Sequence, residues 1–249
     1  MEKELFVKCQ SEVDSSEIKG KGAKARLEDI YRRHHAEHNR YGYLYCHGER
    51  IPYLQKWIGK GKRILDLGCR DGRLTESYVN GNQVVGVDVD RAALEMAQQR
   101  LSIETRWLDL NTEWPFAPES FDVIVAGEIL EHLYFLTPFL ENLYFTLKPG
   151  GMFIGSVPNT FRLRNRLKFL AGYEFENDQT HVRMFSREKL HSLLSLFFSD
   201  IEIIPIRGKV LPGWSIAPGM PHLFHGLFAK DLLWRCVRKE HIARLRPVN

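Results

Sequence analysis

The sequence predicts an α/β fold built on a mostly parallel sheet, and two observations carry that prediction. In the first, an apolar run at 64–67 passes through a glycine-containing turn and a helical segment into a second apolar run at 84–87. A strand, a helix and a second strand in this order form a right-handed βαβ unit. In the second, further apolar runs alternate with helical segments and extend the sheet, at Ile103 to Trp107, Phe121 to Ala126, Met152 to Val157, Ile201 to Ile206 and Leu232 to Val237. We expect the last of these strands to pair with the strand before it.

The helices between these strands have recognisable boundary residues. Asp90 can cap a helix over Arg91 to Leu101, and Ser186 can cap one that runs to Phe198. Pro138 suits the first turn of a helix, which the Pro-Gly-Gly sequence at 149–151 should end. Ahead of the first strand, Ala25 to His35 and Tyr53 to Ile58 read as helices on either side of a Tyr- and His-rich stretch. We expect His34, His35 and His38 to form a solvated helix face.

The turn after the first strand predicts the kind of ligand. Open parallel sheets bind ligands at the carboxyl ends of their strands. Asp88 lies twenty residues after Gly68, the separation at which such folds place a carboxylate on a ribose diol. A dinucleotide would need a glycine where Arg70 stands, and the carboxylates of Asp66 and Asp71 would repel phosphates. The sequence therefore predicts a nucleoside cofactor that carries positive charge near this turn.

Composition indicates an ordinary globular domain. The chain has 249 residues, of which 44% are hydrophobic and 27% charged. We expect residues 1–23 to be a flexible tail and residues 24–249 to form one domain. The four cysteines are isolated in the sequence, which favours a reducing compartment over a disulfide framework. With no apolar run long enough to span a membrane and no signal-peptide pattern, we expect a soluble, cytoplasmic protein.

The turn Asp-Leu-Gly-Cys-Arg-Asp-Gly at 66–72 resembles motif I of the class I S-adenosylmethionine-dependent methyltransferases. The resemblance continues, in the family's order, through 85–90, 108–110, 121–133 and 147–151. It implies a Rossmann-like, seven-stranded, mostly parallel sheet with an antiparallel last strand. It also implies four segments, namely an N-terminal helical cover at 24–60, a cofactor-binding core at 61–157, a lid or acceptor insert after strand five at 158–185, and a C-terminal helix and strand pair at 186–249.

The resemblance further implies that the cofactor is S-adenosyl-L-methionine. The family's matching acid at Asp109 contacts the adenine amine, and Leu110 would supply a neighbouring backbone contact. Arg70 departs from the glycine that most relatives have, and we expect it to keep an ordinary backbone conformation and to point to solvent or to the methionine carboxylate. The cofactor-binding residues predicted in this way are Asp66, Gly68, Cys69, Arg70, Gly72, Asp88, Val89, Asp109 and Leu110.

A second group of polar residues follows the fourth strand. If a helix begins there, Glu128, Glu131 and His132 share one face, because they lie three and four residues apart. Two carboxylates and an imidazole suit a divalent metal such as Mg. The pattern resembles the Glu-x-x-Glu-His motif of the ubiquinone-biosynthesis O-methyltransferases and of the small-RNA 3′-end 2′-O-methyltransferases, which add a later histidine that His181 matches loosely. We predict these four residues as catalytic and metal-binding; the alternative is that Glu131 caps or pairs and His132 closes the pocket or acts as a general base.

The segment 161–170 places four basic residues among apolar ones, without an acid. Such a basic amphipathic helix can make peripheral contact with an anionic membrane surface. Clustered arginines also bind nucleic-acid phosphates, although a net charge of +4 argues against a broad nucleic-acid footprint. The third interpretation is a lid helix packed over the acceptor pocket.

Together these features predict a methyltransferase that acts on a hydroxyl oxygen of a small acceptor such as a phenol, a quinone precursor or a sugar, with or without a divalent metal. An RNA ribose 2′-O-methyltransferase is the alternative enzyme. A protein that keeps the cofactor fold but works as a non-catalytic scaffold or partner subunit is the alternative from another class. The identity of the acceptor depends on loops that a single sequence does not fold.

Overall fold

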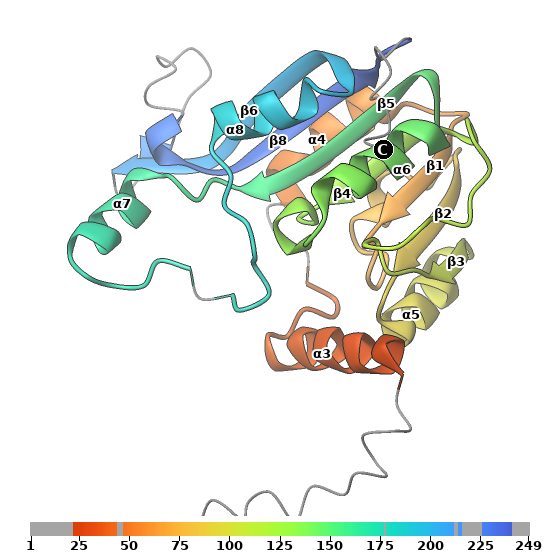
Figure 1. Cartoon of the computed structure of the whole chain (residues 1–249), viewed down its shortest axis with the longest axis horizontal. Helices are drawn as coiled ribbons and strands as arrows, with labels where there is room; N and C mark the ends of the chain where they lie inside the picture. Colours follow the sequence, from red (N-terminus) through yellow and green to blue (C-terminus); the bar gives the residue numbers. More distant parts are fainter. Residues whose placement is uncertain (1–21, 44–46, 177, 212–213, 216–225, 241–249) are drawn as a thin grey trace, which may run out of the picture.

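A mixed sheet with the strand order β3-β2-β1-β4-β5-β8-β6-β7 forms the centre of the protein (Figure 1). The computed structural model describes residues 22–43, 47–176, 178–211, 214–215 and 226–240. Residues 1–21 of the expected tail lie outside this description. Within it, no helix is long and apolar enough to cross a membrane.

Strands β1 to β5 pair in parallel, whereas β8 lies antiparallel between β5 and β6. This confirms the seven-stranded, mostly parallel sheet with an antiparallel last strand; the two-residue β7 adds a short edge. The strands are β1 Arg63–Leu67, β2 Gln83–Asp88, β3 Glu104–Trp107, β4 Phe121–Gly127, β5 Leu147–Pro158, β6 Phe198–Leu211, β7 Trp214–Ser215 and β8 Ala229–Arg238.

Helices cover both faces of the sheet. Apolar side chains of α6 and α8 pack in one core cluster, and those of α4 and α5 pack in the other. The predicted caps at Asp90 and Ser186 are confirmed, because their side chains accept hydrogen bonds from the backbone N–H of Ala93 and Lys189. The helices are α3 Ala23–Glu37, α4 His47–Ile58, α5 Arg91–Leu101, α6 Leu136–Thr146, α7 Leu163–Leu170 and α8 Arg187–Leu194, with 3₁₀ helices at Thr75–Ser77 and Leu130–His132.

Several elements differ from the sequence prediction; helix α4, for example, begins at His47 rather than at Tyr53. The crossover between β1 and β2 contains only the 3₁₀ helix Thr75–Ser77, since the short connection also has to make turns at positive-φ glycines. Helix α6 ends at Thr146, because the Pro-Gly-Gly sequence at 149–151 already belongs to β5. Helix α8 ends at Leu194 rather than at Phe198, which begins β6.

The contact between β5 and β8 requires a glycine. Gly155 lies opposite Trp234 in the antiparallel register, and the indole ring of Trp234 is fully buried. A Cβ atom at Gly155 would lie 2.3 Å from Trp234 Cζ2 and 2.5 Å from the carbonyl oxygen of Ala126. Neither the buried ring nor the backbone of β4 has space to move away.

We therefore expect Gly155→Ala to lower the free energy of unfolding by about 1–3 kcal/mol, as overpacking of a filled core does. Urea denaturation of the variant and of the parent measures the difference. Gly48→Ala is the matched control, because a Cβ at Gly48 in α4 meets nothing within 4 Å. Equal stability of Gly155→Ala and the parent would contradict this description of the core.

Candidate active site at the carboxyl edge of the sheet

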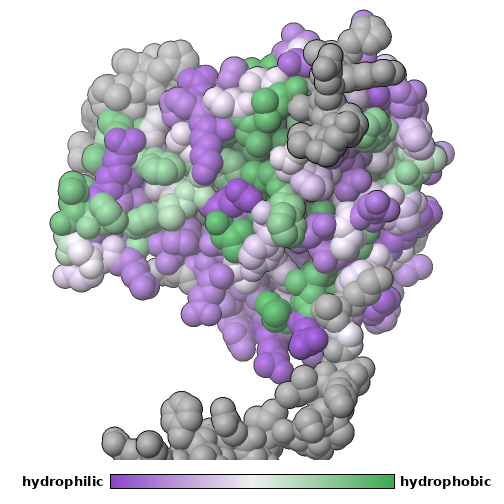
Figure 2. Space-filling view, in the orientation of Figure 1, coloured by the Kyte–Doolittle hydropathy of each residue, from purple (hydrophilic) through white to green (hydrophobic). Residues whose placement is uncertain are grey.

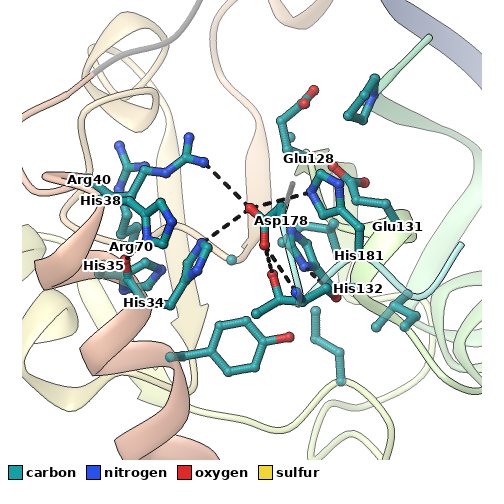
Figure 3. Close-up of a pocket in the computed structure, with 18 of the residues that line it drawn as sticks. His34, His35, His38, Arg40, Arg70, Glu128, Glu131, His132, Asp178 and His181 are labelled. Carbon is teal, nitrogen blue, oxygen red and sulfur yellow. Dashed lines mark hydrogen bonds and ion pairs between the residues drawn. The ribbon is translucent and has the colours of Figure 1, made fainter. Parts of the chain in front are cut away.

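A cavity of about 620 Å³ opens at the carboxyl ends of the parallel strands. One part, the loop half, is lined by residues 68–70, 88–89 and 108–111, which follow β1, β2 and β3. The other part, the imidazole half, is lined mainly by residues 127–129, 131–134, 158–160, 162, 165, 175–176 and 178–181. Helix α3 covers both, as the side chains in Figure 3 illustrate.

The loop half begins at a tight turn. Gly68 has φ +69°, and an added Cβ would lie 2.1 Å from Ile129 Cδ1. Arg70 also has a positive φ, of 50°, so the prediction of an ordinary backbone conformation is wrong. Its N–H donates to the Asp88 carboxylate at 2.9 Å, and its guanidinium binds the Asp71 carboxylate and the Tyr43 carbonyl oxygen. These bonds compensate for the strained backbone and direct the side chain towards the 42–43 turn.

Asp88 ends β2 with a buried carboxylate at the cavity wall. It accepts hydrogen bonds from the backbone N–H of Arg70 and of Asp90, both at 2.9 Å. Burial raises the pKa of Asp88, and the neighbouring His35 and the two N–H donors only partly offset that rise. The carboxylate is thus held rigidly beside the space that a ribose diol would occupy.

Most of the other predicted cofactor residues also line the loop half, but two do not. Cys69, Val89, Asp109 and Leu110 line the cavity, and Asp109 Oδ1 accepts hydrogen bonds from Asn111. Asp66 and Gly72 are absent from the cavity lining.

Asp66 instead stabilises the interior of the turn. Its buried carboxylate accepts hydrogen bonds from Thr75 Oγ1 at 2.6 Å and from Tyr78 Oη at 2.7 Å. Burial raises the pKa of Asp66 to about 6, against the lowering effect of these two bonds. This geometry therefore does not support a direct contact between Asp66 and the cofactor.

Helix α3 closes the cavity on the side opposite the sheet. His34 and His35 are half-buried at the cavity wall beside carboxylates, so the prediction of a solvated helix face is wrong for these two, whereas His38 is exposed as predicted. The helix is fastened at the cofactor side by Asp90, whose Oδ2 accepts from Tyr41 Oη at 2.6 Å and lies 2.8 Å from His35 Nδ1. These two histidines are held at the cavity by acids from distant parts of the chain, which the periodicity of the helix does not reveal.

A second carboxylate fastens α3 to the imidazole half. Asp178 Oδ2 lies 3.5 Å from His34 Nε2 and 3.5 Å from an Arg40 nitrogen, and 3.7 Å from His181 Nε2 (Figure 3). Asp178 stands three residues before His181 in the sequence, but no local pattern indicates its contact with α3. Nor does any local pattern indicate that Arg50 and Tyr31 line the same cavity.

The α-helix expected to begin at Glu128 is not formed, since α6 begins only at Leu136, and this corrects the geometry predicted for Glu128, Glu131 and His132. Glu128 has φ +59°, and its N–H donates to the Ser156 carbonyl oxygen at 2.8 Å. Only the 3₁₀ turn Leu130–His132 follows. Glu128 is consequently turned to Arg50, 2.5 Å away, and does not join Glu131 and His132 on one helix face.

Glu131 carries a carboxylate that is 1% exposed and has no hydrogen-bond partner at either oxygen in the described part of the chain. Burial, followed by the charge of Glu128, raises its pKa well above the ordinary value. The backbone oxygen of Glu131 accepts from the N–H groups of Val182 and Arg183, at 2.9 and 3.1 Å. That pairing brings His181 next to His132, with ring centroids 4.8 Å apart.

The two imidazoles are held in defined orientations. His132 Nδ1 lies 3.1 Å from the Thr180 carbonyl oxygen and so carries the proton, which leaves the lone pair on Nε2. Burial, followed by the charge of His181, lowers the pKa of His132 to about 4. His181 Nδ1 lies 3.1 Å from Glu176. Burial lowers the pKa of His181, but Glu176 and Asp178 outweigh it and raise the pKa overall.

Three of the four predicted metal ligands converge. One donor atom each from Glu131, His132 and His181 lies within 4.8 Å of the others. A buried carboxylate without a partner and a neutral imidazole form an N/O donor set that fits a divalent cation. Glu176, beside His181, is the kind of carboxylate that orients a ligating imidazole. We call Glu131, His132 and His181 the Glu131 cluster. Glu128 also lines the cavity but lies outside this cluster.

Comparison with known proteins identifies the family of the chain. The profile of the family described as "Methyltransferase domain" matches residues 33–197. The chain belongs to the S-adenosylmethionine-dependent methyltransferase family. Among solved structures, a SAM-dependent methyltransferase from Archaeoglobus fulgidus is similar with a TM-score of 0.59 and 20% identity, over 76% of this chain and 92% of that one.

Curated relatives of this methyltransferase include enzymes of ubiquinone biosynthesis. The mitochondrial ubiquinone biosynthesis O-methyltransferase of Mus musculus is 29% identical over 219 residues, which cover 77% of this chain and 58% of the relative. The ubiquinone biosynthesis O-methyltransferase of Pseudomonas savastanoi is 32% identical over 117 residues, 44% of this chain and 50% of the relative. The chain thus spans about half the length of these relatives.

For this methyltransferase we expect Asp88→Asn to weaken S-adenosylmethionine binding by roughly 10- to 100-fold, because a hydrogen bond to a charged group contributes about 1.5–3 kcal/mol. Calorimetric titration with the cofactor measures the change. Glu95→Gln, on the exposed face of α5, removes a charge away from the cavity and is the control. An unchanged affinity in Asp88→Asn would show that the ribose lies elsewhere.

Proposed function

We propose that this protein transfers the methyl group of S-adenosylmethionine to a hydroxyl oxygen of a small acceptor, a phenol or quinone precursor, with a divalent cation bound at the Glu131 cluster. The observation that carries the proposal is the buried, unpartnered carboxylate of Glu131 beside a neutral His132. The names of the curated relatives support an oxygen acceptor.

The chemistry needs a deprotonated acceptor in line with the sulfonium methyl. A divalent cation, when bound, supplies positive charge that lowers the pKa of the acceptor hydroxyl. Glu131, His132 and His181 would hold that cation at the wall of the imidazole half. The rigid loop half would hold the cofactor across the same cavity, and much of the remaining acceleration comes from fixing the two reactants together.

The state of His132 favours a ligand over a general base. A general base works best with a pKa near the operating pH, and a pKa of about 4 is far below it. A metal ligand instead needs a neutral ring with a free, oriented lone pair. The contact of His132 Nδ1 with the Thr180 carbonyl oxygen supplies that orientation.

We also propose that helix α7 contacts a membrane surface, which would present an apolar acceptor to the enzyme. Leu167, Phe169 and Leu170 are 56%, 69% and 80% exposed. The helix projects from the end of β5 (Figure 1), and hydrophobic and hydrophilic residues lie side by side over it (Figure 2). Residues 159–173 contain no acid, so their positive charge complements an anionic lipid surface. The first turn of α7 lines the cavity through Asn165, whereas these apolar side chains further along the helix are exposed.

Two alternatives make different predictions. An RNA ribose acceptor would produce competition by short RNA with a steep dependence on salt concentration. A non-catalytic scaffold would bind cofactor without releasing demethylated product over any acceptor panel.

We expect Glu131→Gln to lower methyl transfer to a catechol by on the order of 100-fold or more, because the variant keeps the shape of the side chain but loses the anionic ligand. Titration of Mg²⁺ or Mn²⁺ into the metal-free protein, followed by calorimetry, should show a matching loss of cation affinity. Glu113→Gln, at an exposed position, is the control. Turnover that chelators and Glu131→Gln both leave unchanged would exclude the metal.

We expect Phe169→Ser with Leu170→Ser to reduce sedimentation with vesicles that contain anionic phospholipid. The two changes remove exposed apolar surface that insertion would bury. Leu196→Ser, which changes another exposed leucine, is the control. Equal sedimentation of both variants and the parent, or none by the parent, would contradict the membrane contact.

A further inference from the structure

The turn that carries Glu131 and His132 has little regular structure of its own. It consists of the short 3₁₀ helix Leu130–His132, and α6 does not begin until Leu136. Leu130 and Leu133 pack into the core and fix the depth of the turn on the sheet. The backbone carbonyl groups of Leu133 and Tyr134 lie between the two helices, so they need hydrogen-bond donors from another part of the chain.

Arg183 supplies those donors. Its Nε donates to the Leu133 carbonyl oxygen at 2.8 Å, and its Nη2 donates to the Tyr134 carbonyl oxygen at 2.5 Å. Its backbone N–H donates to the Glu131 carbonyl oxygen at 3.1 Å. Within the part of the chain that the structure describes, Arg183 makes no ion pair. A half-buried arginine that directs its guanidinium to two consecutive carbonyl groups fixes the turn rather than a charge.

Asn111 holds the same turn from the cofactor side. Its Oδ1 accepts a hydrogen bond from the Tyr134 N–H at 3.1 Å. Its Nδ2 and its backbone N–H donate to Asp109 Oδ1, at 3.1 and 2.9 Å. Hydrogen bonds thus run without a break from Asp109 in the loop half through Asn111, Tyr134 and Arg183 to Glu131. We call these contacts the Asp109–Glu131 chain.

We propose that Asn111 and Arg183 are positioning residues that couple the cofactor site to the Glu131 cluster. A cofactor that binds beside Asp109 and fixes its carboxylate would also fix, through the Asp109–Glu131 chain, the turn that carries Glu131 and His132. A second ligand at the cluster would then lose less conformational freedom on binding, which gives positive cooperativity. The coupling rests on the proposed function, in which the cofactor lies in the loop half and the cation lies at the Glu131 cluster.

A second connection between the two halves runs through helix α3, which contacts Asp90 through His35 and Asp178 through His34. Neither Asn111 nor Arg183 takes part in those contacts. Substitutions at these two positions therefore interrupt the Asp109–Glu131 chain and leave the fastening of α3 in place, so they separate the two routes.

Hydrogen exchange of the Val182 amide tests the coupling, because this N–H donates to the Glu131 carbonyl oxygen at 2.9 Å. Demethylated cofactor should slow the exchange by roughly 10-fold in the parent, a typical size for coupling between sites. The slowing should be lost in Asn111→Ala and in Arg183→Gln, and Arg183→Lys should keep part of it. Arg26→Gln, at an exposed position of α3, is the control and should keep all of it.

Each variant is measured at a cofactor concentration that saturates it, so that a change in cofactor affinity alone does not imitate the loss. The absence of slowing in the parent would overturn the coupling. Equal slowing in the parent, Asn111→Ala and Arg183→Gln would also overturn it, because α3 would then transmit the effect by itself.

Calorimetric titration with Mn²⁺ separates this inference from the proposed function. The affinity of the parent for Mn²⁺ should rise by about 5- to 10-fold when demethylated cofactor is bound, and Asn111→Ala and Arg183→Gln should show no such rise. A parent that binds no Mn²⁺ but shows the cofactor-dependent slowing at Val182 would overturn the proposed cation and leave the coupling standing. A rise of the same size in the parent and in both variants would overturn the coupling.

Discussion

The pairing of the segment after β4 with the loop before α8 determines the form of the site. Two backbone N–H groups, from Val182 and Arg183, donate to the carbonyl oxygen of Glu131. The same pairing buries the Glu131 carboxylate and sets His181 beside His132, although the two histidines are far apart in sequence. Burying a charged carboxylate without a partner costs free energy of folding. Only a proton or a bound cation would neutralise the Glu131 carboxylate at this point.

Helix α3 connects the two halves of the cavity. Its last turn is bound through His35 to Asp90, at the turn that follows β2, and through His34 to Asp178, in the loop that carries His181. Both contacts join an acid to groups from α3 or the residues just after it. In the proposed reaction, a helix fastened in this way would exclude water from the space between cofactor and acceptor, where electrostatic interactions would then act more strongly.

The sequence predicted those parts of the structure that depend on local pattern. The positions of the first five strands in the sequence, the cap at Asp90 and the carboxyl ends of the parallel strands follow from apolar periodicity and turn chemistry, and they place Asp88 and Asp109 at the cavity. The rest depends on distant partners. Arg70 adopts a positive φ because its N–H reaches Asp88, and Glu128 turns away because Arg50 from α4 binds it. Asp66 is directed inward by Thr75 and Tyr78, and the histidines of α3 face the cavity because Asp90 and Asp178 hold that helix.

The proposed function requires a divalent cation at the Glu131 cluster. Anomalous diffraction from crystals of the protein with demethylated cofactor, soaked in Mn²⁺, tests this directly. We expect a single strong anomalous peak within coordination distance of Glu131, His132 and His181. Cofactor bound in the loop half with no peak at this cluster, at a Mn²⁺ concentration that saturates any effect on turnover, would contradict it.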